Sequence, residues 1–311
     1  MRKTNMHKKL VFTAVFLMLA LMLISVKPAN SQVQLETIFI RPDGTVSPST
    51  AAIEQNGNTY TFTDNINAAI KIQKSNIVLN GAGYTLLGPY SGEQSDLWFI
   101  GTGTSQLPTS TQQYTMGVDL GNSSVVGVVV ENLNVKNFSI GMYMWTRNNT
   151  VVGNSVSGNV IGILLSGSNN TVSKNYIANN QRGLFFGFNN KGDIIPSDIV
   201  IEQNSFEGNL IQLNGCECKD PNSTEPLHSW DDGRQGNFWS DYNGTDANHD
   251  GIGDTAYVID VLNQDRYPLM QSPVQSPVPA AKVPVEAIAL GVSAAVVLAV
   301  AVLAYRRRQR A

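Results

Sequence analysis

The chain has 311 residues, of which 42% are hydrophobic and 14% are charged, and its formal net charge is −3. The charge is unevenly distributed, because residues 31–280 contain 23 acidic and 11 basic residues, a net charge of −12, while both ends are basic. An acidic central region argues against nucleic acid or anionic lipid as a partner, and it is compatible with cation binding.

Residues 1–30 have the pattern of a secretory signal peptide. Basic residues between Arg2 and Lys9 precede an apolar run over residues 10–24, and small residues follow Lys27. A basic start, an apolar stretch and small residues are the three parts of such a signal. The run is also long enough to be an uncleaved anchor, so both alternatives stay open. Residues 32–90 are then expected to form the first strands and the N-terminal cap of a β-helix.

The central part of the sequence repeats with a period of 21 residues. Gly141, Gly162 and Gly183 occupy equivalent positions, and Val135, Val156 and Ile177 do so as well. A period of about 20 to 25 residues, rich in β-branched residues and without a helical pattern, is typical of a solenoid with one turn of extended chain per repeat. We therefore predict an all-β, right-handed parallel β-helix whose coils occupy residues 91–215.

The β-helix is expected to have about eight coils between residues 60 and 240, over roughly 40 Å at strand spacing. Two other folds are less compatible with the repeat. A two-sheet sandwich would not need a constant 21-residue register, and a propeller has repeats about twice as long.

Asparagines recur at fixed positions in these coils. One such column contains Leu133 in its first copy, which indicates an interior position. Stacked interior amides can donate to one neighbouring coil and accept from the other, and such hydrogen bonds would offset the burial of the amides. We therefore predict structural ladders of Asn154, Asn175 and Asn204, and of Asn159, Asn180 and Asn209.

The corners between strands are predicted at two recurring motifs. The glycine column of Gly141, Gly162 and Gly183 fits a corner at which φ is positive. A second corner is predicted at residues 148–150 and 169–171, where Asn-Asn-Thr recurs. Six candidate N-glycosylation sequons, several of them at these corners, begin at Asn122, Asn137, Asn148, Asn169, Asn222 and Asn243.

The only two cysteines, Cys216 and Cys218, begin the region expected to close the β-helix, residues 216–271. A disulfide between them would close a strained ring, and a local structural pair is one interpretation. The alternative is a soft-metal site, because thiolates suit Cu(I). Histidine outside the signal is limited to His228 and His249.

Residues 246–254 match most of a calcium-binding loop. Asp246, Asn248, Asp250 and Asp254 provide oxygen side chains, and Ile252 provides a main-chain carbonyl at position 7. Position 12 is Tyr257, where an EF-hand has a bidentate glutamate, so a further ligand would have to come from elsewhere. The sequence predicts calcium here, and a turn without an ion is the alternative.

The C-terminal part has the composition of a stalk followed by a membrane anchor. Residues 272–284 are rich in proline, residues 285–305 form an apolar run rich in Ala and Val, and residues 306–311 contain four arginines. An apolar run of this length can span a bilayer with the arginines on the cytoplasmic side. We expect a single-pass protein of the cell membrane. Its ectodomain would be extracytoplasmic, and its C-terminal helix would span the membrane.

Several segments resemble the NosD-like family of periplasmic β-helix proteins. The resemblance covers about residues 35–270 and depends on residues 75–86, 131–141 and above all the closing motif over residues 232–254 and 267–269. The anchored form, with its stalk and basic tail, is similar to archaeal cell-surface proteins that carry this module. The resemblance implies a copper-accessory role, because named members of the family assist copper supply to nitrous oxide reductase.

The residues themselves favour a non-enzymatic surface scaffold, or a module that recognises glycans or envelope proteins. The aromatic residues that could stack on sugar rings lie on successive coils near one corner: Tyr143, Trp145, Phe185, Phe186 and Phe188. A copper-accessory protein is one alternative, with Met142 and Met144 as further soft side chains. A polysaccharide lyase or hydrolase is another, but the carboxylates within the repeats, such as Glu131 and Glu202, do not form pairs on adjacent coils.

Overall fold

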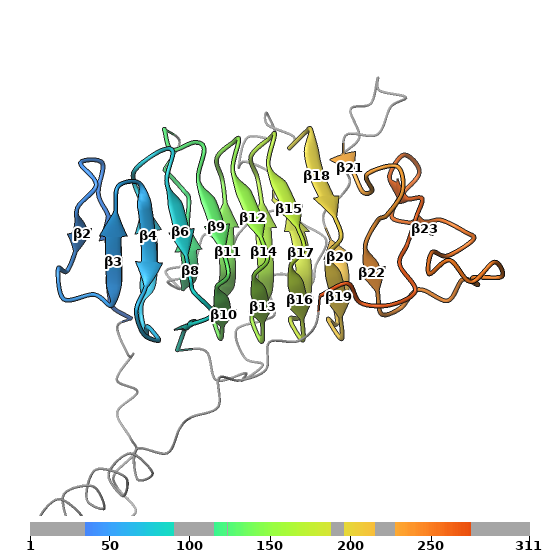
Figure 1. Cartoon of the computed structure of the whole chain (residues 1–311), viewed down its shortest axis with the longest axis horizontal. Coiled ribbons are helices and arrows are strands. Elements are labelled where there is room, and N and C mark those ends of the chain that lie inside the picture. Colours follow the sequence, from blue (N-terminus) through green and yellow to red (C-terminus); the bar gives the residue numbers. More distant parts are fainter. Residues whose placement is uncertain (1–34, 90–114, 123, 188–195, 215–227, 275–311) are drawn as a thin grey trace, which may run out of the picture.

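The computed structural model describes residues 35–89, 115–122, 124–187, 196–214 and 228–274. Over these residues the chain winds as a parallel β-helix with three sheets along its length, and the strands follow one another side by side from blue to orange in Figure 1. The predicted parallel β-helix is confirmed, and the sandwich and the propeller are excluded. The described residues contain no α-helix.

Each complete coil contributes one strand to each of the three sheets, and sheets 1 and 3 also contain an antiparallel pair at the N-terminal end. Sheet 1 has β1 (Thr37–Ile40), β2 (Val46–Ser47), β5 (Ala69–Ile72), β8 (Met116–Asp119), β11 (Ile140–Met144), β14 (Ile161–Leu165), β17 (Arg182–Phe186) and β20 (Ile211–Asn214). Sheet 2 has β7 (Thr85–Leu87), β10 (Asn134–Lys136), β13 (Ser155–Ser157), β16 (Tyr176–Ala178), β19 (Ser205–Glu207) and β22 (Phe238–Trp239). Sheet 3 has β3 (Ile53–Asn56), β4 (Thr59–Phe62), β6 (Val78–Asn80), β9 (Val129–Glu131), β12 (Thr150–Val152), β15 (Thr171–Ser173), β18 (Ile199–Glu202) and β21 (His228–Ser229).

The chain passes through sheets 3, 2 and 1 in turn, so the described residues contain five complete coils, from β6–β7–β8 to β18–β19–β20. Partial coils precede and follow them. About eight coils were expected between residues 60 and 240; residues 90–114, between β7 and β8, lie outside the described residues. Residues 188–195, between β17 and β18, and residues 215–227, between β20 and β21, also lie outside the described residues.

Beyond the last strands of the coils lies a segment that we call the C-terminal cap, residues 240–274, drawn in orange to red in Figure 1. Its two short strands, β23 (Tyr257–Val258) and β24 (Gln264–Asp265), pair only with each other. The ring of Tyr257 stacks on Trp239 with centroids 4.3 Å apart, and Trp239 stacks on Phe206 at 4.4 Å. The cap therefore continues an interior column of the coils, although it contributes no strand to the three sheets.

The predicted corner at the glycine column is wrong. Gly141, Gly162 and Gly183 lie inside strands of sheet 1 and are not among the residues with positive φ. A Cβ at Gly162 would lie 2.5 Å from the carbonyl oxygen of Gly183 and 3.0 Å from Nδ2 of Asn180. Glycine is required there because the neighbouring coil and an interior asparagine approach too closely for a side chain.

In the four coils that begin at β9, β12, β15 and β18, the corners instead have a left-handed residue at three positions. Asn148 and Asn169 are at one of them, as the Asn-Asn-Thr motif indicated, with φ of 59° and 56°. The other two positions are occupied along the coils by Asn132, Gly153, Lys174 and Gln203, and by Asn137, Gly158, Asn179 and Gly208. Asparagine adopts this conformation more readily than most residues, which accounts for the asparagine content of the corners.

The interior asparagines form hydrogen-bonded ladders. Nδ2 of Asn154 donates to Oδ1 of Asn175 at 3.0 Å, and Asn175 donates to Asn204 at 3.0 Å. The same oxygens accept the main-chain N–H groups of the preceding rungs at 2.9 and 3.0 Å. A parallel ladder joins Asn159, Asn180 and Asn209 at 3.1 and 3.0 Å. Every rung is buried. These bonds satisfy amides that would otherwise destabilise the interior.

Two features of the ladders were not predicted from the sequence. A third ladder joins Asn149 to Asn170 at 3.2 Å beside the corner motif. The first ladder continues from Asn204 to Asn237 at 3.0 Å, across a chain separation of 33 residues. A strict 21-residue period does not reveal Asn237, because residues 215–227 intervene.

Within the described part of the chain, no helix is long and apolar enough to span a bilayer. The predicted signal over residues 1–30, the membrane helix over residues 285–305 and the basic tail over residues 306–311 lie outside the described residues. Most of the proline-rich stalk, residues 272–284, also lies outside them.

Candidate functional site: a polar cleft at the C-terminal end of the coils

A cleft with a volume of about 630 Å³ lies between the last coils and the C-terminal cap. Three segments contribute to its walls: residues 198–200 at the start of β18, residues 228–231 of the last partial coil, and Leu262, Gln264 and Arg266 of the cap. The volume is within the range of small-molecule sites. The cap is therefore part of the cleft and not only the end of the fold.

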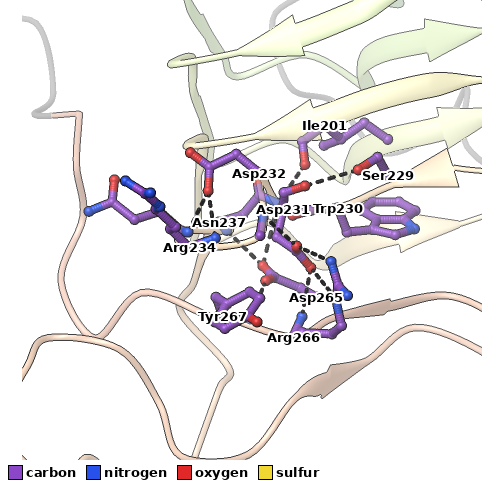
Figure 2. Close-up of polar contacts among 12 residues, drawn as sticks. Ile201, Ser229, Trp230, Asp231, Asp232, Arg234, Asn237, Asp265, Arg266 and Tyr267 are labelled. Carbon is purple, nitrogen blue, oxygen red and sulfur yellow. Dashed lines mark hydrogen bonds and ion pairs between the residues drawn. The ribbon is translucent and has the colours of Figure 1, made fainter.

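Asp231 and Arg266 join the last coil to the cap across this cleft, as Figure 2 shows. The Asp231 carboxylate accepts from Nη2 of Arg266 at 2.6 Å, from Nε at 3.0 Å and from the main-chain N–H at 3.1 Å. The main-chain N–H of Gly233 also donates to it at 2.9 Å. Burial alone would raise the pKa of Asp231, but the bonds from Arg266 and Gly233 outweigh it and hold the pKa below its usual value.

His228 lines the cleft and is only 4% exposed. Its ring stacks on Phe186 with centroids 4.7 Å apart and an interplanar angle of 11°, and it meets Trp230 edge-on. Among the described residues, neither ring nitrogen has a hydrogen-bond partner. A buried imidazole without a partner has unused capacity to donate, to accept or to bind a metal.

Carboxylates also gather on the outer side of sheet 3 beside the cleft. The register pairs Val200 with Ser229, which places Glu202 next to Asp231 on the adjacent coil. Burial and the charge of Asp232 raise the pKa of Glu202. Only carboxylates within the repeats were considered in the sequence, and this approach of Asp231 and Asp232, which lie beyond the repeats, to Glu202 was not predicted.

Asp265 lies between the cleft residues Gln264 and Arg266 and is fully buried. Its Oδ2 accepts from the main-chain N–H of Asn237 at 2.6 Å and from Nε1 of Trp239 at 2.9 Å, and its Oδ1 accepts from the N–H of Tyr267 at 3.1 Å. Burial nevertheless dominates and raises the pKa of Asp265 to about 6.

The predicted calcium loop forms a closed set of turns in the cap. Asp246 accepts from the N–H groups of Asp250 and Gly251 at 3.1 and 3.0 Å, and Asp254 accepts from that of Ala247 at 2.8 Å. Asn248 and Asp250 are bonded to each other, and the N–H of Ile252 donates to Asp250. These bonds account for the acidic side chains as turn-forming groups, and the structure gives no support for calcium.

No group of three or more His, Cys, Asp or Glu side chains is arranged to hold a metal in the described part of the chain. The predicted copper ligands Cys216 and Cys218 lie outside that part. Met142 and Met144 are fully buried in the hydrophobic core, where they act as packing side chains. Among the described residues, His228 is the histidine whose ring nitrogens are both buried without a hydrogen-bond partner.

The candidate glycosylation sites differ in accessibility. Asn148, Asn169 and Asn243 are exposed, Asn122 and Asn137 are half-buried, and Asn222 lies outside the described residues. The aromatic residues proposed to stack on sugars also divide. Phe186 is in the core, whereas Tyr143 and Trp145 are half-buried on the outer face of sheet 1 with ring centroids 5.9 Å apart.

Comparison with known proteins gives one match. The family described as "Periplasmic copper-binding protein (NosD)" matches residues 30–244, which is more than half of the chain and includes all five complete coils. No curated protein and no solved structure is detectably similar to the chain. The matched region and the parallel β-helix agree, and the chain belongs to the NosD family.

Proposed function

We propose that this NosD-family protein is an extracytoplasmic, non-enzymatic recognition module whose ligand site is the polar cleft. Residues 285–305 would anchor it in the cell membrane, with residues 306–311 in the cytoplasm and the β-helix outside. The ligand class that best suits the cleft is a glycan of the cell envelope.

The observation that supports this proposal is the kind of group that surrounds the cleft. Ser229 and Gln264 are exposed, and the Arg266 side chain is 55% exposed although Asp231 holds its guanidinium in place. A site that contains both hydrogen-bond donors and acceptors suits the hydroxyl groups of a sugar, which can donate and accept. Because β18 and β21 are paired strands of sheet 3, the coil side of the cleft would bind without large rearrangement.

The test is binding of the full-length protein to a panel of neutral and acidic polysaccharides. Gln264→Ala should weaken the binding by about fivefold or more, because it removes two donors and one acceptor from the cleft. Gln55→Ala is the matched control, since Gln55 is an exposed glutamine at the opposite end of the β-helix. Equal binding by both variants, or no binding to any polysaccharide, would contradict the proposal.

A copper-accessory role is the second candidate, and two observations favour it. The family is described as copper-binding, and His228 has unsatisfied ring nitrogens in a buried position. Imidazole and thiolate are both copper ligands, so His228 would be joined by Cys216 and Cys218. Copper(I) titration against a competing chelator should then give a stoichiometric site that His228→Phe weakens and His249→Ala does not.

Polysaccharide cleavage is the outcome that would overturn the non-enzymatic proposal. The residue to change is Glu202, since its raised pKa and its carboxylate neighbours are properties of a general acid. Release of oligosaccharides by the full-length protein, abolished in Glu202→Gln and retained in Glu207→Gln, would identify an enzyme.

A further inference from the structure

The last described residues of the chain turn back over the side of the β-helix. Leu269 forms a parallel bridge with Phe238 of β22, at the end of sheet 2. Three residues later, the hydroxyl groups of Ser272 and Ser205 are 2.6 Å apart, and Ser205 Oγ also lies 3.4 Å from the carbonyl oxygen of Val274. Ser205 belongs to β19, on the other side of β22. The chain therefore runs from the end of sheet 2 back toward earlier coils.

Ser205 is part of an outward-facing column of sheet 2. The neighbouring Phe206 is in the hydrophobic core, so Ser205 points outward. The register places Tyr176 and then Ser155 beside it on the two preceding coils, whose strands β16 and β13 lie next to β19 in Figure 1. These three outward side chains are buried, at 0%, 9% and 6% exposed. Outward residues on the same coils of sheet 3 are only half-buried: Val200, Thr171 and Thr150. Sheet 2 is therefore covered over these three coils.

Ser155 has an unused hydroxyl group on this covered face. Its Oγ is buried and has no hydrogen-bond partner within the part of the chain that the structure describes. Two coils further along, the equivalent hydroxyl of Ser205 has two partners, the Ser272 hydroxyl and the Val274 carbonyl. Because buried polar groups are normally hydrogen-bonded, a second serine and carbonyl beside Ser155 would complete the same arrangement.

The sequence after Val274 contains such a second serine. Residues 271–274 are Gln-Ser-Pro-Val, and residues 275–278 repeat the same four residues, with Ser276 in the place of Ser272. Four residues of polyproline II chain span about 12 Å, and the two strand spacings from Ser205 to Ser155 span about 10 Å. A chain that keeps its direction past Val274 therefore brings Ser276 opposite Ser155.

The composition of residues 275–279 suits a segment that lies across the strands without joining the sheet. Pro277 and Pro279 have no N–H group to pair with a strand, and they favour the extended polyproline II conformation. On the face below, Tyr176 and Ala178 present an aromatic ring and a methyl group on one strand. Aromatic side chains are the usual partners of proline-rich segments in this conformation.

We propose that residues 275–279 form a strap that continues from Val274 along the outer face of sheet 2, packs its prolines on Tyr176 and bonds Ser155 through Ser276. The stalk is then not a free spacer, because its first part is bound to the β-helix. Together with the membrane anchor proposed above, on which this consequence alone rests, the strap would orient the protein. The β-helix would lie along the membrane with sheet 2 toward it, instead of standing on its C-terminal end.

The first test is a disulfide bond between the two serine positions. Ser155→Cys and Ser276→Cys are combined in full-length protein that also carries Cys216→Ser and Cys218→Ser. Mild oxidation should join positions 155 and 276 in most molecules, as measured by mass spectrometry of non-reduced peptides. Thr150→Cys with Ser276→Cys is the matched control and should form no bond, because Thr150 is on the same coil but on the outer face of sheet 3.

A different cover would give a different cross-link. Residues 90–114 also leave the coils from sheet 2, after β7. They are less suited as the cover, since Ser272 and Val274 already lie on this face beside Ser205. A bond from Ser155→Cys to Ser105→Cys, or no bond between positions 155 and 276, would overturn the proposal.

The second test measures the cover of Tyr176 by hydroxyl-radical labelling. Replacement of residues 275–279 by Gly-Ser-Gly-Ser-Gly in the full-length protein should raise the labelling of Tyr176 about threefold or more, because a flexible linker has no prolines to pack on the ring. Tyr60 in the core and Tyr143 on sheet 1 should be labelled as before, which would show that the fold is intact and the effect local. Unchanged labelling of Tyr176 would overturn the proposal. Neither test uses a glycan, so its failure is distinct from that of the proposed function.

Discussion

The coils and the C-terminal cap differ in where their interior side chains find their partners. In the coils, each interior position receives its partner from the equivalent residue of the next turn, as Asn175 does from Asn204 and Val156 does from Ile177. In the cap, the partners come from unrelated places: Asp265 continues the asparagine ladder and Tyr257 continues the aromatic column.

Because of this difference, we expect the contacts of the coils to be less sensitive to pH than those of the cap. A neutral amide that recurs on successive coils gives the β-helix hydrogen bonds that do not depend on pH. The cap has one copy of each contact, and one of its partners is a titratable group. We expect substitutions in the coils to change the stability of the whole fold, and substitutions in the cap to change the cleft.

The largest expected effect tests the coils. Asn175→Ala removes bonds to Val151 O, Ser173 O and Asn204 Oδ1, and leaves donors of Asn154 without an acceptor. The free energy of unfolding should fall by about 3 kcal/mol or more, since several buried polar groups lose partners together. Asn179→Gly is the control, because Asn179 is an exposed corner residue with φ of 54°. Glycine adopts this conformation readily, so denaturant unfolding should show almost no change.

The next effect tests the cap through its dependence on pH. Folding raises the pKa of Asp265 from 3.8 to about 6, so its contribution to stability is fully present below pH 3.8 and is lost as the pH rises through about 6. The loss is at most about 3 kcal/mol. Urea unfolding from pH 4 to pH 7 should show this decline relative to Asp265→Asn. Parallel curves for the two proteins would contradict it.

A smaller effect distinguishes close approach from backbone conformation in the glycine column. Gly162→Ala should lower the free energy of unfolding by about 2 kcal/mol, because the added methyl group overpacks the interior. Its Cβ would lie 2.5 Å from the Gly183 carbonyl oxygen. Gly57 has open space around a Cβ and only a positive φ of 61°. Gly57→Ala should therefore cost about 1 kcal/mol. If thermal or urea unfolding gave the same loss of stability for both variants, the close approach between coils would not account for the cost of Gly162→Ala.

The smallest effect concerns the turns predicted to bind calcium. Asp254→Ala removes acceptors of Ala247 N–H and Thr245 Oγ1, both in an exposed part of the cap. A loss of about 1 kcal/mol is expected. The loss should be the same in calcium and in chelator, as measured by urea unfolding. A loss that occurs only with calcium would instead support the ion predicted from the sequence.

The sequence predicts the coils better than the cap for a physical reason. A repeated position has several copies in one chain, so Asn154, Asn175 and Asn204 together indicate an interior ladder from their spacing alone. Periodicity does not say whether a recurring glycine turns the chain or admits a neighbouring backbone, and Gly162 shows that the second explanation applies. Asp265 has no second copy, and its role depends on a contact with Asn237 that no local pattern reveals.

The ladder spacing also bears on how such proteins diversify. Asn154 and Asn175 are 21 residues apart, Asn175 and Asn204 are 29 apart, and Asn204 and Asn237 are 33 apart, yet all three amide bonds are 3.0 Å long. The bond length between rungs therefore stays the same whatever the number of residues in a coil. A corner can gain or exchange a loop without disturbing the frame on either side, so new surface loops can evolve, or be grafted, one corner at a time.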